Sequence, residues 1–121
     1  MNLGRIREIL RADAIAGTSL DREIEMVCAC DVMSEVLSCA QIRSNSLLLT
    51  NLTHSQTVRT AEIAEISAIC FVRGRKPDSQ TLELAKKNDI VLLSTSFSLY
   101  ESSGRLYREG IPGCSESKET R

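Results

Sequence analysis

The chain is poor in several kinds of residue, and each shortage argues against a class of function. Aromatic residues make up 3% of its 121 residues and tryptophan is absent, which argues against base-stacking surfaces and aromatic ligand cages. Fifteen lysines and arginines stand against sixteen aspartates and glutamates, and the net charge of −1 disfavours binding of nucleic acid through excess positive charge. No apolar run reaches the length of about 18 residues that a membrane-spanning helix needs.

The rest of the composition is typical of one small globular domain. Hydrophobic residues make up 42% and charged residues 26% of the chain, whose length suffices for a single core. The first ten residues carry charges among their apolar positions and lack the apolar segment of a signal peptide, so we expect a cytoplasmic protein. In that reducing compartment the five cysteines are expected to be buried thiols. We predict a domain over residues 1–111 and a flexible polar tail over residues 112–121.

Helical and strand periodicities alternate along the chain. Apolar residues at helical spacing predict helices at 2–11, 32–40, 54–65, after Asp78 and at 96–109. Period-two or continuous apolar runs predict strands at 24–30, 46–50, 66–72 and 90–93, with a further short segment at 14–16. Alternation at this spacing predicts parallel neighbours joined by right-handed crossovers. The expected fold is therefore α/β, a three-layer α/β/α sandwich with a mostly parallel sheet of about five strands.

Some positions have a specific expected role in this fold. Four residues spaced two apart are predicted to share one face of a strand: Ile24, Met26, Cys28 and Cys30. The inner face of the helix that follows is predicted to consist of Val32, Met33, Val36, Leu37 and Ala40. Three residues that precede helices are predicted to cap them: Asp31, Asp78 and Ser96.

The order of several segments resembles that of DRTGG-domain proteins. The segments are the opening helix, LDREI (Leu20–Ile24), CDVMSEVL (Cys30–Leu37), the run from Arg73 to Thr95, and SLYESSGRLY (Ser98–Tyr107). The likeness covers roughly residues 1–110 and is nearest to short stand-alone members found beside iron hydrogenase genes, which are similar to the N-terminal domain of HPr kinase/phosphorylase. The resemblance implies an α/β/α fold, related also to the N-terminal domain of the Mur ligases, and no established catalytic activity.

The chain departs from this family pattern at its name-giving motif. The pattern places Thr-Gly-Gly after the fourth strand, where this chain has Val72-Arg73-Gly74 followed by Arg75 and Lys76. A ligand bound through Thr-Gly-Gly elsewhere in the family is therefore in doubt here. Kinase activity is not carried over either, because it resides in a separate P-loop domain and no GxxxxGK[ST] motif occurs in this chain.

Polar residues follow three of the predicted strands. The carboxyl ends of parallel strands meet at one edge, where open α/β sheets bind ligands and where helix N-termini attract anions. The candidate ligand-binding residues are Thr50, Asn51, Thr53, His54, Arg73, Gly74, Arg75, Ser94, Thr95 and Ser96. The expected ligand is a small anionic metabolite, such as a nucleotide or another phosphorylated compound. Alternatively, these residues serve as helix caps and solvated loops, which every α/β fold needs at the same positions.

The remaining reactive residues do not complete a catalytic or metal site. Cys28 and Cys30 would point together on a strand and are the candidate metal ligands, but buried apolar packing is the alternative. The other cysteines, Cys39, Cys70 and Cys114, show no matching second pair. His54 is the only histidine, and no nucleophile is tied to it by spacing. We therefore predict no catalytic residue, no cofactor and no complete metal site.

The last predicted helix has a broad apolar face that holds both tyrosines. Docking on the sheet accounts for part of such a face, and a second subunit is the alternative, because tyrosine is enriched at interfaces. We predict a homodimer with the candidate interface residues Leu99, Tyr100, Leu106 and Tyr107.

These observations favour a non-catalytic regulatory or ligand-binding module. The family resemblance adds a redox enzyme, such as iron hydrogenase, as the expected partner. Two alternatives stay open. One is a sensor domain that binds a nucleotide or phosphorylated metabolite at the strand ends, and the other is a metal-handling accessory protein built on the cysteine pair.

Overall fold

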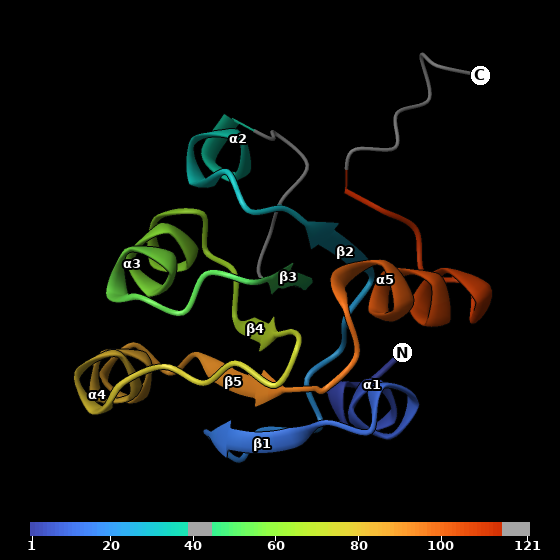
Figure 1. Cartoon of the computed structure of the whole chain (residues 1–121), viewed down its shortest axis with the longest axis horizontal. Helices are drawn as coiled ribbons and strands as arrows, with labels where there is room; N and C mark the ends of the chain where they lie inside the picture. The colour runs from blue at the N-terminus through green and yellow to red at the C-terminus, as the bar shows by residue number, and fades with distance from the viewer. Residues whose placement is uncertain (39–44, 115–121) are drawn as a thin grey trace.

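The computed structural model describes residues 1–38 and 45–114, and it shows a central sheet between two layers of helices (Figure 1). In chain order the elements are α1 (Leu3–Leu10), β1 (Asp13–Ala16), β2 (Met26–Ala29), α2 (Met33–Ser38), β3 (Ser46–Thr50), α3 (Ser55–Ile63), β4 (Ala68–Phe71), α4 (Ser79–Lys87), β5 (Val91–Ser94) and α5 (Leu99–Arg108). These bounds lie within a few residues of those that the sequence pattern predicts.

The five strands form one sheet in the order β1-β5-β4-β3-β2. The neighbours from β2 to β5 are parallel, whereas β1 runs antiparallel to β5 at one edge. One helix connects each pair of parallel neighbours, because a parallel connection must return to the starting end of the sheet. The predicted three-layer sandwich with a mostly parallel sheet is confirmed, and its mixed character comes from the β1 edge.

Successive residues of the inner strands pack against different helical layers. In β3, Leu47 and Leu49 belong to the core on the α1 and α5 side, while Leu48 belongs to the core on the α2, α3 and α4 side. Figure 1 shows these two sets of helices on opposite sides of the sheet. Because helices cover both faces, the inner strands are buried throughout and show no polar alternation.

The caps of α4 and α5 only partly match the prediction. Asp78 caps α4 as expected, and its carboxylate accepts a hydrogen bond from the N–H of Thr81 at 2.8 Å. The cap of α5 is Ser98, whose hydroxyl accepts from the N–H of Glu101 at 3.1 Å. The predicted cap Ser96 is wrong, because the helix begins two residues later than a cap at that position requires.

The start of α2 also differs from the prediction. Asp31 directs its carboxylate toward the end of β3, and the sulfur of Cys30 accepts a hydrogen bond from the N–H of Val32 at 3.3 Å. Val36 is buried as predicted, but Val32 and Leu37 are 48% and 46% exposed. The reason is that a helix of six residues offers only a narrow stripe to the core. Residues 39–40 of the predicted helix lie outside the described residues.

The predicted strand at 24–30 is shorter in the structure, and Ile24 lies outside it. Met26, Cys28 and Cys30 do share the face that packs toward α2, α3 and α4. Ile24 packs toward α1 and α5 instead. Its N–H donates to the carbonyl of Met1 at 2.8 Å, so this segment pairs with the N-terminus before the strand begins.

Residues 112–114, which the polar sequence after residue 111 predicts to be part of a flexible tail, join the outer edge of β2. The N–H of Val27 donates to Pro112 at 3.0 Å, and the N–H of Cys114 donates to Val27 at 2.8 Å. Cys114 is buried in the core on the α2 side. The domain therefore extends at least to residue 114, and residues 115–121 lie outside the described part. Among the described helices, none combines the length and the apolar character needed to cross a membrane.

Candidate functional site

The carboxyl ends of β3, β4 and β5 lie side by side, as the sequence predicts. Phe71 at the end of β4 is the register partner of Thr50 on one side and of Ser94 on the other. Beyond the strands, the N–H of Gly74 donates to the carbonyl of Thr95 at 2.8 Å. The edge formed by residues 50–54, 73–76 and 94–97 is termed the carboxyl rim below.

Asp31 organises the β3 side of the carboxyl rim. Its carboxylate accepts hydrogen bonds from the Thr50 hydroxyl at 2.7 Å, from the Asn51 backbone N–H at 2.8 Å and from the Asn51 amide at 3.0 Å. Burial alone raises the pKa of Asp31, but these hydrogen bonds and the charge of Arg75 outweigh it and hold the pKa below the ordinary value of 3.8. Asp31 is therefore ionised at neutral pH and anchors the loop that leaves β3.

The loop that leaves β4 is held by hydrogen bonds, both within the loop and to the segment that leaves β5. The N–H groups of Arg73 and Gly74 donate at 2.8 Å to carbonyls of the segment that leaves β5, and that of Arg75 donates to Val72 at 3.2 Å. The Ser94 hydroxyl donates to the carbonyl of Arg75 at 2.9 Å. Because these N–H groups are occupied, recognition of a ligand at this loop falls to side chains.

Three hydroxyl groups of the predicted site are buried and bonded within the protein. Those of Thr50 and Ser94 make the bonds described above, and that of Thr95 donates to the carbonyl of Leu10 at 2.6 Å. They hold the strand ends to one another and to the end of α1. A ligand would therefore meet the more exposed members of the carboxyl rim.

Arg73 has a backbone conformation that favours glycine. Its φ angle is 62°, and the φ angle of Gly74 is 70°. Such left-handed geometry costs a residue with a side chain roughly 1 kcal/mol relative to glycine. Arg73 stands at the position where the DRTGG pattern has its first glycine. A Cβ at Gly74 would meet no atom of the described residues within 4 Å, so the loop has open space beside it in this part of the structure.

Cationic side chains gather around this loop. Three exposed residues carry the charge there: Arg73, Arg75 and Lys76. Within the described part of the chain, none of the three lies within 4.0 Å of a carboxylate. The neighbouring Phe97 ring has the guanidinium of Arg105 at 4.0 Å from its centroid and that of Arg11 at 6.0 Å. This part of the carboxyl rim is therefore rich in positive charge.

The N-terminus of α3 opens onto the same rim. Its N-cap residue His54 makes no side-chain capping bond, unlike Asp78 of α4 and Ser98 of α5. The hydroxyl of Thr57 and the carbonyl oxygen of the Asn51 amide are buried without a hydrogen-bond partner among the described residues. An uncapped helix N-terminus attracts an anion through its N–H groups and its dipole.

The fold thus keeps part of the predicted site accessible and adds residues to it. The exposed or half-buried members are Asn51, Thr53, His54, Arg73, Gly74, Arg75 and Ser96. Five residues near this site were not predicted from the sequence: Asp31, Arg11, Phe97, Thr57 and Arg105. Thr57 and Phe97 follow the predicted strand-end residues closely in the chain, whereas Asp31, Arg11 and Arg105 come from three other segments that only the fold brings there.

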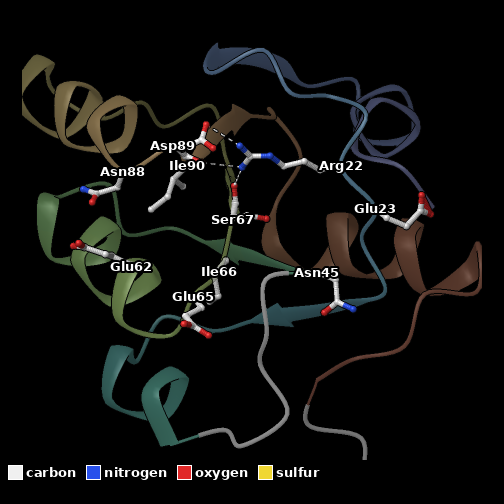
Figure 2. Close-up of a pocket in the computed structure, with 10 residues that line it drawn as sticks. All are labelled: Arg22, Glu23, Asn45, Glu62, Glu65, Ile66, Ser67, Asn88, Asp89 and Ile90. Atoms are coloured by element: carbon white, nitrogen blue, oxygen red, sulfur yellow. Dashed lines mark hydrogen bonds and ion pairs between the residues drawn. The ribbon is translucent and has the colours of Figure 1, made fainter.

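A pocket of about 500 Å³ lies at the opposite edge of the sheet, beside the amino ends of β4 and β5 (Figure 2). The Arg22 guanidinium donates to the carbonyl of Ser67 at 2.6 Å and to that of Asp89 at 2.9 Å, and it pairs with the Asp89 carboxylate at 2.8 Å. Four carboxylates line this pocket: Glu23, Glu62, Glu65 and Asp89. Its acidic lining does not suit the anionic ligand that the sequence predicts.

The cysteines of the described chain give no support to a metal-handling function. Cys28 is buried in the core, and the sulfur of Cys30 is hydrogen-bonded to the backbone of Val32. Burial raises the pKa of the Cys70 thiol to about 12, so it stays protonated. Within residues 1–38 and 45–114, no group of three or more His, Cys, Asp or Glu side chains could hold a metal ion. Cys39 lies outside those residues.

The four residues of the predicted α5 interface differ in burial. Leu106 is buried and Leu99 is half-buried, and both pack onto the core. Tyr100 and Tyr107 are 88% and 65% exposed. A groove of about 350 Å³, lined by residues of α5 and β2, lies beside the two tyrosines.

Comparison with known proteins agrees with this architecture. No protein-family model matches the chain, and no curated protein matches it. A solved structure superimposes on it with a TM-score of 0.64, namely the CBS and DRTGG domains of the regulatory region of Clostridium perfringens pyrophosphatase in complex with its activator, diadenosine tetraphosphate. The chain has a DRTGG-type fold. Sequence identity is 19%, and the match covers 87% of this chain and 45% of that chain, so this chain spans less than half of its neighbour.

Proposed function

We propose that this DRTGG-type chain is a non-catalytic regulatory module that binds a nucleotide or another phosphorylated metabolite at the carboxyl rim. The observation that carries the proposal is Arg73, an exposed arginine in a left-handed backbone conformation that favours glycine. Residues in unfavourable conformations cluster at functional sites, where the surroundings enforce them. Here the enforced conformation places a cation at the rim, next to Arg75.

Two kinds of group at the carboxyl rim complement a phosphate. The guanidinium groups of Arg73 and Arg75 can each form paired hydrogen bonds with phosphate oxygens. The uncapped N-terminus of α3 adds N–H donors and a positive dipole end beside His54. Because the Asp31 carboxylate also attracts Arg75, we expect Arg73 to make the stronger phosphate contact.

The structural neighbour supports a regulatory role. The pyrophosphatase chain with a similar fold is a regulatory region, and it was solved with a dinucleotide activator. The P-loop needed for the kinase chemistry of HPr kinase is missing from this sequence. A module that binds and signals needs no catalytic group of its own.

Thermal unfolding and calorimetry test the proposed site directly. The full chain is titrated with ATP, ADP, pyrophosphate and diadenosine tetraphosphate, and at least one of them is expected to raise the melting temperature, because a ligand of the folded state stabilises it. Arg73→Gly is expected to weaken that binding by about tenfold or more, the loss of one charge-assisted contact. Since glycine suits the left-handed conformation, this variant should fold at least as well as the parent.

Lys87→Ala is the matched control. Lys87 ends α4 at the opposite edge of the sheet, so the variant loses one positive charge without touching the carboxyl rim. Its affinity should equal that of the parent chain. The proposal fails if none of the four compounds binds, or if Arg73→Gly and Lys87→Ala bind equally well.

We further propose a redox enzyme, such as an iron hydrogenase, as the regulated partner. This second proposal rests on the sequence resemblance to stand-alone DRTGG proteins found beside iron hydrogenase genes. The activity of such an enzyme, measured with and without the chain, should change in the presence of the bound compound. An activity that is the same in all four combinations of chain and compound would reject this partner.

A further inference from the structure

The two tyrosines of α5 form an unusual surface. Tyr100 and Tyr107 are seven residues apart, which places them on one face of the helix about two turns apart. They are 88% and 65% exposed, although each carries a large apolar ring that gains from burial. The groove beside them has apolar walls that include Val27, Leu106 and Ile111. One surface thus combines projecting rings with a hollow that could receive such rings.

Gly104 lies between the two tyrosines on the same face of α5. The residue is exposed, and a Cβ built on it would meet no atom of residues 1–38 or 45–114 within 4 Å. Glycine in the middle of a helix is unfavourable relative to alanine, but it allows another backbone to approach closely. The helix surface is therefore low at Gly104 and projects at the tyrosine on either side. Such a surface can pack against a second copy of itself related by two-fold symmetry.

The charges along α5 also fit two-fold packing about Gly104. Glu101 lies in the first turn and Arg108 in the last turn, on either side of Gly104. If two α5 helices cross antiparallel at Gly104, Glu101 of each copy approaches Arg108 of the other. A parallel crossing would instead bring like charges together, so charge and shape favour the same arrangement.

We propose that a second copy of this chain docks on this face, with the two α5 helices antiparallel about a two-fold axis near Gly104. In such a symmetric contact each interaction occurs twice. Tyr107 of one copy enters the groove of the other beside Tyr100, and Glu101 pairs with Arg108. Tyrosine rings that fill pockets near the centre of an interface commonly dominate its affinity. The dimer does not depend on the ligand proposed for the carboxyl rim.

Sedimentation equilibrium of the full chain tests this dimer. The parent chain is expected to dimerise in the micromolar range, and Gly104→Arg and Tyr107→Glu should each raise the dimer dissociation constant about tenfold or more. Gly104→Arg is informative because no atom of the described residues lies within 4 Å of the Cβ that it adds. Ile63→Glu is the matched control, since Ile63 is 70% exposed on α3 in the other helical layer. This control should leave the dissociation constant unchanged.

A charge exchange tests the antiparallel arrangement. Arg108→Glu alone and Glu101→Arg alone should each weaken the dimer, because both set like charges against each other. An equimolar mixture of the two variants should recover the parent affinity, since every pair across the mixed interface is then of opposite charge. Glu101 also pairs with Arg105 within its own helix at 2.9 Å, so circular dichroism must show that both variants keep the parent helix content.

Each contrary outcome has a definite meaning. A parent chain that stays monomeric throughout the micromolar range would overturn the proposal and leave the tyrosines to a different partner. A dimer that is insensitive to Gly104→Arg and Tyr107→Glu would also overturn it, because the contact must then lie elsewhere. Failure of the mixture to recover affinity would reject the antiparallel crossing.

Discussion

At the carboxyl rim several side chains tie the strand ends together, whereas at the amino edge of the sheet one side chain, Arg22, ties β4 to β5. Asp31 accepts three hydrogen bonds from Thr50 and Asn51, and the Ser94 hydroxyl closes the neighbouring loop. The pocket of about 500 Å³ lies at the amino edge, away from these bonds. In this molecule a large hollow and the groups suited to an anion therefore lie at opposite ends of the same strands.

Electrostatics accounts for this separation. The N-termini of α3, α4 and α5 point toward the carboxyl rim, where Arg73 and Arg75 add further positive charge. The C-termini of α3 and α4 point toward the amino edge, where Glu65 and Asp89 follow the helices. A pocket between carboxylates and helix C-termini disfavours a phosphate, however well its volume fits.

Asp31→Ala is expected to have the largest effect on stability. The change leaves the Thr50 hydroxyl and two N–H donors of Asn51 without their acceptor, and we expect a loss of about 3 kcal/mol in the free energy of unfolding. Urea denaturation followed by circular dichroism measures it. Asp21→Ala, at an exposed position, is the control and should change stability by less than about 0.5 kcal/mol. Equal effects of the two changes would remove the special role given to Asp31.

Arg22→Ala should destabilise the amino edge by a smaller amount. Two carbonyls, those of Ser67 and Asp89, lose their shared donor, and we expect a loss of about 2 kcal/mol by the same denaturation measurement. Arg22→Lys should recover only part of this loss, because an ammonium group cannot reproduce the planar fork of the guanidinium. If Arg22→Ala lowers the free energy of unfolding more than Asp31→Ala does, the amino edge and not the carboxyl rim has the more stabilising side-chain contacts.

The contribution of Asp31 at the carboxyl rim should also depend on pH. Because the folded pKa of Asp31 lies below the ordinary value of 3.8, its ionised form stabilises the fold above that pH, and this contribution is lost as the pH falls through the folded pKa. The unfolding free energies of the parent and of Asp31→Asn should therefore differ at neutral pH and converge below pH 3.8. A difference for Asp31→Asn that is constant with pH would contradict the assignment.

The smallest effects on stability are expected from replacing one residue at each edge with glycine. Glu65 and Arg73 both have a φ angle of 62°, so Glu65→Gly and Arg73→Gly should each stabilise the protein by roughly 0.5 to 1 kcal/mol. Thermal melts measure this gain. The two variants should differ in function, because only Arg73→Gly removes a side chain from the carboxyl rim. If Glu65→Gly weakens nucleotide binding as much, the ligand lies at the amino edge.

Much of the fold could be predicted from local patterns. The buried runs at 68–71 and 91–94 are strands that helices cover on both faces, and Asp78 caps the helix that follows it. Ser96 and Ser98 show where such patterns fail, since two serines stand close to one helix start and spacing does not choose between them. The prediction that Ile24 belongs to the strand was wrong for another reason. The backbone of Ile24 pairs with Met1, which lies outside any predicted strand.

The candidate site could be predicted in part. Parallel strands must end at one edge, so the proximity of Thr50, Gly74 and Thr95 follows from the strand assignment alone. The occupation of the loop N–H groups and the left-handed conformation of Arg73 do not follow from it, because both depend on the way the loop folds back on the segment after β5. The exposure of Tyr100 and Tyr107 could not be predicted from the sequence either, because an apolar helix face has the same residue pattern whether it contacts the core or solvent.

By itself the sequence determined the alternation of helices and strands and the meeting of strand ends at one edge, because hydrophobic periodicity and chain direction act over neighbouring residues. Only the tertiary structure decided that Asp31 holds the loop after β3 and that Arg22 reaches Ser67 and Asp89. Those contacts join segments far apart in the chain, and local spacing carries no information about which distant polar groups will share a hydrogen bond.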